Sequence, residues 1–189
     1  MNSIDKKQNK SSVKKDIKDI FYKGVINKNI SLSIVNIGDN LKDTIEQVIS
    51  KEIEGKCISE GYIKPNSTKI ISYSSGLIDG ANILFSVIFE CLICYPTEGM
   101  IINCNIKNIT KAGIKAQTND EPSPVIIFLA KEHHKKIKSF TSLSVEDNIQ
   151  IKVIGQRYEL HDKFISIIGE LVEKKKKKQF SKKRIVITN

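Results

Sequence analysis

The alternation of apolar and polar residues predicts a strand and then a helix near the start of the chain. Residues 28–33 (KNISLS) alternate polar and apolar and end in the turn-prone NIGDN, which predicts a short half-buried strand. A helix should follow, capped by Asn40 or Asp39, with Asp43 favourable in its first turn and Gly55 at its end. Apolar residues repeat at helical spacing on one face of this segment: Leu41, Ile45, Val48, Ile49 and Ile53.

A long strand is predicted over residues 83–95. The segment before it is rich in Gly, Ser and Asn, which is typical of short strands joined by exposed loops. Within the strand the even positions include Ser86 and Glu90, whereas every odd position is apolar: Ile83, Phe85, Val87, Phe89, Cys91, Ile93 and Tyr95. Pro96 should end the strand and the first module with it.

After Pro96 the pattern is that of strands and turns, with one short helical candidate at residues 131–138. Residues 102–106 alternate, and NITKAG turns the chain into a second strand at residues 114–116. A wholly apolar strand follows at residues 125–130. NIQIKVI and KFISIIGELV then form two further strands around the polar loop GQRYELHDK. Five strands with a short helix between the third and fourth are typical of an OB-fold β-barrel, so the fold class is α+β.

The net charge of +10 over 189 residues is carried by the two ends of the chain. Residues 1–19 hold six Lys and three Asp, and residues 174–189 hold seven Lys, one Arg and no acid. The stretch between them has 17 bases and 18 acids, so the pI does not indicate that the folded body binds nucleic acid. Residues 1–20 are interpreted as a disordered Lys-rich arm. The basic tail fits phosphate binding, a nuclear-import address or a solubilising segment.

The sequence favours an intracellular protein. No apolar run approaches the roughly 18 residues that cross a bilayer, and no apolar stretch of a secretory leader follows the first lysines. The four cysteines are therefore expected to be reduced. Cys57 and Cys104 should pack as small apolar residues.

The polar residues offer no catalytic or metal-binding pattern. Cys91 and Cys94 form a CxxC, but side chains three apart on a strand point to opposite faces. The adjacent side chains of His133 and His134 diverge, and together with His161 they have no Cys or carboxylate at metal-ligand spacing. We expect His133 and His134 to be solvated. No nucleophile elbow, paired-carboxylate signature or phosphate-binding glycine fingerprint is present, which predicts no catalysis, no cofactor and no metal.

An OB barrel often binds single-stranded nucleic acid through a positive groove and aromatic platforms. The candidate RNA-binding residues on the outside of the barrel are Asn105, Lys107, Lys115, Phe128, Lys152, Arg157 and Tyr158. Phe128 could instead belong to the core, and the polar residues could form a solvated face. With at most two stacking aromatic rings, we expect weak binding without sequence preference.

The chain resembles the RNA polymerase subunit 7/E family over residues 21–173. The resemblance rests on the helix followed by EGKC at 54–57, GYI at 61–63, the junction YPTEGM at 95–100 and the hairpin NITKAGI. It implies an RNP-like tip module at residues 21–97 that docks on the polymerase core, and an S1/OB barrel at residues 98–173 beside the emerging transcript. By resemblance the loops that reach the core contain Gly55, Lys56, Cys57, Gly61 and Tyr62.

Two departures from the family pattern bear on function. The loop after Cys57 is shorter than in cellular members, which would alter the docking surface. RNA-binding S1 barrels carry aromatic residues around the second strand, where this chain has Ala112, Ile114 and Ala116. The Lys-rich tails and a residue usage that suggests an AT-rich genome favour a homologue from a large DNA virus. Cytoplasmic, virion-associated and nuclear locations stay open.

The first hypothesis is a non-catalytic stalk subunit of a DNA-directed RNA polymerase. Its partners would include the largest core subunits and nascent RNA, which it would bind weakly, and it would not contact a membrane. Whether it also has a smaller stalk partner stays open. The apolar odd face of the long strand would then be partly interfacial. The alternative is a free-standing S1-domain RNA-binding protein in translation or RNA handling, and a third hypothesis is a scaffold whose barrel binds only protein. If the protein is a stalk subunit, bulky residues at Gly55 and Gly61 should abolish its association with the polymerase core. If it is a free-standing RNA-binding protein, the same substitutions should leave RNA binding intact.

Overall fold

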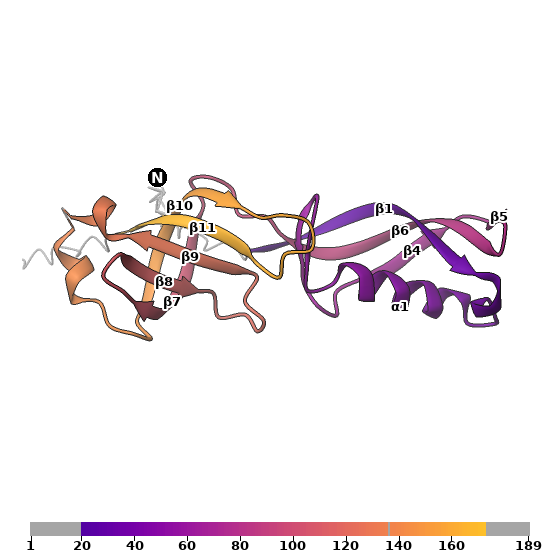
Figure 1. The fold of residues 1–189 in the computed structure, drawn as a ribbon, viewed down its shortest axis with the longest axis horizontal. Coiled ribbons are helices and arrows are strands. Elements are labelled where there is room, and N and C mark those ends of the chain that lie inside the picture. Colours follow the sequence, from indigo (N-terminus) through magenta and orange to yellow (C-terminus); the bar gives the residue numbers. More distant parts are fainter. Residues whose placement is uncertain (1–19, 136, 173–189) are drawn as a thin grey trace, which may run out of the picture.

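The computed structural model describes residues 20–135 and 137–172, which form two modules arranged end to end (Figure 1). The predicted N-terminal arm and basic tail lie outside these residues, apart from Ile20 at the end of the arm. In the described part of the chain, the helices are too short and too polar to cross a membrane.

The tip module is a sheet built around one long central strand, β6. Its elements are β1 (Phe21–Ser33), a 3-10 turn η1 (Ile34–Asn36), α1 (Leu41–Ile53), β2 (Cys57–Ile58), β3 (Gly61–Ile63), β4 (Lys69–Tyr73), β5 (Leu77–Asp79) and β6 (Asn82–Cys94). One edge of β6 pairs with β1, and the other pairs in turn with β3, β4 and β5. The first strand is longer than residues 28–33 because all 13 of its residues pair with β6.

The predicted helix is confirmed, and it covers one face of this sheet. Ile45, Ile49 and Ile53 are buried against the odd positions of β6, which form the core of the tip module. The hypothesis that this face is interfacial is therefore wrong, because α1 of the same chain occupies it. Asn40 is the N-cap residue, but its side chain makes no cap hydrogen bond.

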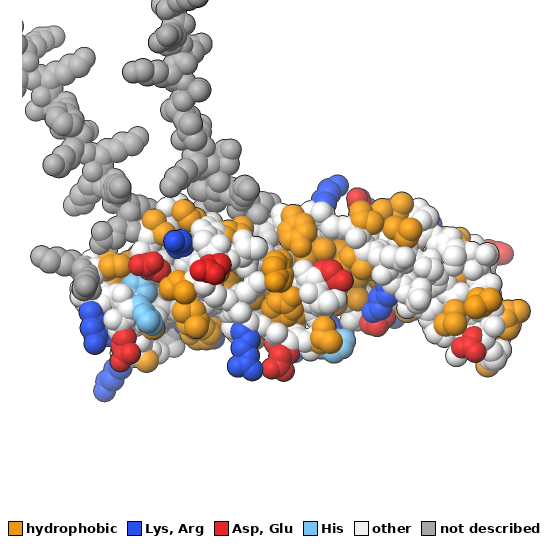
Figure 2. Space-filling model, turned by 90° about the horizontal axis from the view of Figure 1, so that it is seen from above, with side chains coloured by type: hydrophobic (Ala, Val, Ile, Leu, Met, Phe, Trp, Pro, Cys, Tyr) orange, Lys and Arg blue, Asp and Glu red, His pale blue; other side chains and the backbone are white. Residues whose placement is uncertain are grey.

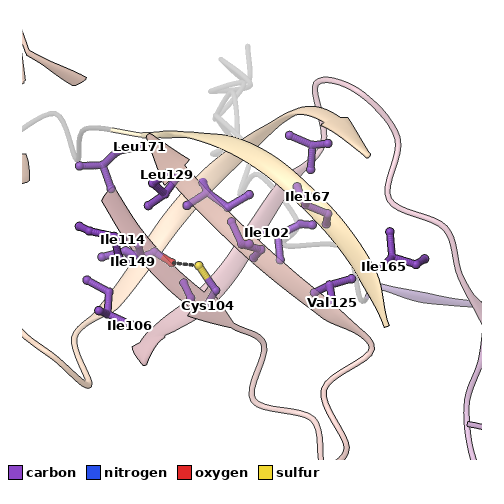
Figure 3. Packing of buried hydrophobic residues seen from close by; sticks show 14 of the residues in the cluster. Ile102, Cys104, Ile106, Ile114, Val125, Leu129, Ile149, Ile165, Ile167 and Leu171 are labelled. Carbon is purple, nitrogen blue, oxygen red and sulfur yellow. Dashed lines mark hydrogen bonds between the residues drawn. The ribbon is translucent and has the colours of Figure 1, made fainter. Parts of the chain in front are cut away.

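The predicted OB barrel is also confirmed. Its strands are β7 (Ile101–Ile109), β8 (Gly113–Gln117), β9 (Val125–Ala130), β10 (Asn148–Arg157) and β11 (Ile165–Leu171), closed in the order β10-β11-β9-β8-β7. Branched aliphatic side chains from all five strands point into the interior, where the Cys104 thiol donates to the Ile149 carbonyl (Figure 3). The short helical candidate is two 3-10 helices, η2 (Lys131–His134) and η3 (Lys138–Ser142).

His134 corrects the expectation that both adjacent histidines are solvated. His133 is exposed, but His134 is buried and stacks on Phe140 with ring centroids 4.6 Å apart. Its Nδ1 lies 2.7 Å from the Ala130 carbonyl oxygen, and its Nε2 accepts the backbone N–H of Leu171 at 2.9 Å. The imidazole therefore ties η2 to the end of the last strand.

The two modules meet in a joint that shares the apolar core of the barrel. Tyr62, Cys94 and Cys57 of the tip are buried in the same cluster as the barrel interior. Across the joint, Cys57 N–H donates to the Asp162 carbonyl at 2.7 Å and the Cys57 carbonyl accepts His161 N–H at 2.8 Å. The β10–β11 loop is thus held against the tip module by main-chain hydrogen bonds.

Candidate nucleic-acid interface and docking surface

Two of the predicted RNA-binding residues lie side by side on the outside of the barrel. Lys115 on β8 is directly opposite Phe128 on β9. They line a groove of about 390 Å³ with Asn108, Thr110, Ala112, Gly113, Ile114, Leu129, Ala130, His133 and Ile168. The Phe128 side chain is 46% exposed, so it does not belong to the core. We call this surface the barrel groove.

The chemistry of the barrel groove suits one base and its phosphate. Much of its lining is apolar, Phe128 offers an aromatic face, Lys115 supplies a cation and His133 supplies a hydrogen-bonding ring. No carboxylate lines it. Strands β8 and β9 are the second and third of the barrel, the pair whose outer face binds oligonucleotides in OB folds. Sequence reasoning missed Ile168 in this groove, because only the pairing of β11 with β9 places it opposite Phe128. It also missed His133, which reaches the groove from η2.

The other predicted RNA-binding residues do not join this groove. Lys107 lies 3.2 Å from the Glu146 carboxylate, and Arg157 lies 3.1 Å from that of Glu159. Lys152 is exposed on β10 opposite Glu170 of β11, and Asn105 is partly buried on β7. The structure therefore distributes these side chains around the barrel, and three of the cations have a carboxylate beside or opposite them.

Tyr158 lies at the joint. Its hydroxyl donates to the Ser59 carbonyl at 3.0 Å, and its ring packs edge-on against Tyr95 with centroids 6.2 Å apart. Burial, with nearby Tyr95 adding to it, raises the pKa of this phenol. The ring therefore contributes to holding the two modules together.

Three of the five predicted docking residues are also part of the joint. Cys57, Gly61 and Tyr62 are buried, and burial with the nearby Asp162 raises the pKa of the Cys57 thiol to about 12. Gly55 and Lys56 are half-buried, and the Lys56 ammonium donates to the last carbonyls of α1. Contact of these five residues with a polymerase core stays a prediction.

A bulky residue at Gly61 cannot test docking on the polymerase core, because Gly61 is part of the joint. Gly61 has φ +129°, and a Cβ there would lie 2.5 Å from the Cys94 carbonyl oxygen. A bulky residue at this position would break the joint, so loss of core association would not report on docking.

A different apolar surface is exposed at the free end of the tip module. It consists of Ile34 and Val35 in η1 and Leu77 and Ile78 in β5, and Val35 is 86% exposed. The Ile34 N–H donates to the Ala81 carbonyl at 3.1 Å, which holds the two segments together. Apolar side chains gather at this end of the molecule in Figure 2. We call these four residues the distal patch. Sequence analysis placed Leu77 and Ile78 in a segment of short strands joined by loops and assigned Ile34 and Val35 to no element.

The cysteines behave as packed apolar residues. Cys91 lies in the tip core and Cys94 in the joint, as expected for side chains on opposite faces of a strand. All four cysteines lie outside disulfides and are buried, and burial raises the pKa of Cys91 to about 11 and of Cys104 to about 12. Within residues 20–135 and 137–172, no three His, Cys, Asp or Glu side chains form a metal-binding group.

The fold defines a class of protein: an α+β tip module joined through a shared core to an OB barrel. No family model matches the chain. It is 24% identical over 176 residues to DNA-directed RNA polymerase II subunit 7 of Arabidopsis thaliana, and equally to subunit RPB7 of Glycine max, over 80% of this chain and 98% of each relative. A protein of Acanthamoeba polyphaga mimivirus, named "Putative DNA-directed RNA polymerase subunit L376", is 22% identical over 171 residues, 82% of this chain and 83% of the relative.

The chain is therefore similar to RNA polymerase subunit 7 proteins along most of its length, in agreement with the resemblance seen in its sequence. Both cellular and viral proteins are among these relatives.

Proposed function

We propose that this protein is a non-catalytic stalk subunit of a multisubunit DNA-dependent RNA polymerase. The observation that carries the proposal is the similarity to polymerase II subunit 7, which extends over 98% of that relative and so includes both modules. Phosphodiester chemistry would belong to other chains. An intracellular site of action follows from this role.

We infer that the tip module docks on the polymerase core through the distal patch. This surface exposes four large apolar side chains at one end of an elongated molecule. Burying such side chains against another protein is favourable by about 25 cal/mol for each Å² removed from water. The buried residues of the joint would hold the tip module on the barrel while the tip makes this contact.

The docking proposal is tested by purifying the tagged chain from cells that assemble the polymerase, at about 0.3 M salt, where electrostatic RNA tethering largely dissolves. Recovery of the two large polymerase subunits in near-equal amount supports the stalk function. A double variant, Val35→Asp with Leu77→Asp, should lose them, whereas Val145→Asp, at an exposed position on the barrel, should retain them. Recovery of the wild-type chain alone would favour a free-standing RNA-binding protein.

The barrel is proposed to guide nascent RNA through the barrel groove. One aromatic platform is worth about 1–3 kcal/mol by alanine substitution, so binding should be weak and independent of sequence. Anisotropy of a labelled oligouridylate is expected to show about 5- to 150-fold weaker binding for Phe128→Ala. Phe164→Ala, at an exposed aromatic residue outside the groove, is the control. Equal loss in both variants would contradict the proposal.

A further inference from the structure

The last strand of the barrel ends beside the barrel groove. β11 runs parallel to β9, and Ile168 of β11 is the partner of Phe128. Leu171 is three residues further along β11, which is about 10 Å at the usual rise of a strand. Figure 3 shows Leu171 at the opposite end of the barrel from Val125 and Ile165. The described chain therefore leaves the barrel close to the groove, at the end farther from the tip module (Figure 1).

Hydrogen bonds fix the position of this exit. The Leu171 N–H donates to His134 Nε2 at 2.9 Å, and the Val172 N–H donates to the Gln150 carbonyl at 2.9 Å. His133, the neighbour of His134 in η2, is one of the residues that line the groove. The end of β11 is thus held against the same short helix that contributes to the groove.

The residues that follow β11 in the sequence are strongly basic. Residues 174–189 contain seven Lys, one Arg and no Asp or Glu, and five of the lysines are consecutive at 174–178. A chain spans at most about 3.6 Å per residue, so Lys178, six residues after Val172, lies within about 22 Å of it. This limit comes from chain length alone. It confines five lysines to the neighbourhood of the barrel groove.

The acids near this end do not cancel the positive charge. They are Glu132 in η2, Glu170 in β11, which is opposite Lys152, and Glu173. Residues 131–138 contain four lysines, and Lys115 lies in the groove itself. These five lysines outnumber the three acids before residues 174–189 are counted. The body of the protein is otherwise near neutral, so this end of the barrel is where a polyanion is attracted.

We propose that the barrel groove and residues 174–189 form one RNA-binding site. The groove holds a base on Phe128, and the lysines after β11 contact the phosphates of the neighbouring nucleotides. The inference rests on the proposed guidance of RNA by the groove. Single-stranded RNA is favoured over an acidic protein because the groove offers an aromatic platform, and over duplex DNA because only an unpaired base can stack on it. Of the three interpretations of the basic tail, its place beside the groove supports phosphate binding.

The test measures how salt weakens the binding of a labelled ten-nucleotide oligouridylate to the full chain, by anisotropy between 0.05 and 0.2 M salt. Each phosphate neutralised on a single strand contributes about −0.7 to the slope of log affinity against log salt, so five contacts weaken binding roughly 100-fold over this range. This loss should be at least tenfold smaller in the variant K174Q/K175Q/K176Q/K177Q/K178Q. The matched control makes the same charge change in the N-terminal arm, which enters β1 at the joint, and should keep the wild-type salt dependence: K6Q/K7Q/K10Q/K14Q/K15Q.

Phe128→Ala in the same assay separates this inference from the function on which it rests. Wild-type salt dependence in the tail variant, with weaker binding by Phe128→Ala, would overturn the inference and leave the groove as the RNA site. Unchanged binding by Phe128→Ala, or no binding by the wild-type chain, would overturn both. An equal loss in the arm variant would mean that only net charge matters, and tighter binding of duplex DNA of the same length would assign the lysines to DNA. Either result would overturn the inference.

Discussion

The two modules bury their apolar surface in different ways. The barrel closes on itself, so every strand has two neighbours and the interior is sealed by side chains from all five. In the tip module, α1 covers one of the two faces of the sheet. The side chains of Val25, Ile71, Ile88 and the distal patch are left in solvent. A closed barrel needs no partner to complete its core, whereas a half-covered sheet keeps surface available for one. We therefore expect protein contacts chiefly at the tip module.

At the joint the two modules do not have separate cores, because side chains of the tip module pack into the barrel core there. Tyr62→Ala should reduce the free energy of unfolding by about 3–5 kcal/mol, since it removes a fully buried aromatic ring. Urea denaturation followed by far-UV circular dichroism measures this. The Tyr62 hydroxyl is buried without a hydrogen-bond partner among the described residues, so Tyr62→Phe should be at least as stable as wild type. Two separate transitions in wild type would contradict a shared core.

His134 is a buried polar residue that ties the last strand of the barrel to η2. His134→Leu should cost about 1–3 kcal/mol, because it leaves the Leu171 N–H and the Ala130 carbonyl unpaired in a buried site. The same denaturation experiment measures it. His133→Leu changes an exposed neighbour and should stay within about 0.5 kcal/mol of wild type. Equal effects at both positions would mean that His134 does not hold the last strand.

In the tip, an ion pair joins the helix to the edge strand. The Lys28 ammonium lies 2.6 Å from the Glu52 carboxylate, and both side chains are partly exposed. Glu52→Gln should therefore cost only about 0.2–1 kcal/mol. The difference from wild type should shrink in 1 M salt, where exposed charges are screened. A loss that is independent of salt would indicate a packing role instead.

The smallest stability effect is expected in the barrel groove. Phe128→Ala should change the free energy of unfolding by less than about 0.5 kcal/mol, because the ring is half-exposed and outside the core. Combined with its expected loss of RNA binding, this would separate the groove from the fold. A large destabilisation would instead place Phe128 in the packing of the barrel.

Local patterns predicted most of the fold. The period of α1 and the alternation along β6 and the barrel strands come from residues that are neighbours in sequence. The joint could not be predicted this way, because Cys57 and Tyr62 are covered by a loop about 100 residues further along the chain. The positions of cations around the barrel also escaped prediction. Alternation says that Lys107 and Lys115 point outward, but a register shift between Ile106 and Asn108 and the barrel closure decide in which direction.

The shared core of the joint has a mechanical consequence. Cys57 is hydrogen-bonded through both its N–H and its carbonyl to the β10–β11 loop, and Tyr62 is packed into the barrel cluster, so these contacts oppose bending between the two modules at the joint. An elongated molecule joined in this way would transmit a rotation from one end to the other. A small rotation imposed at the distal patch would swing the barrel groove, at the far end of the molecule, through a proportionally larger arc.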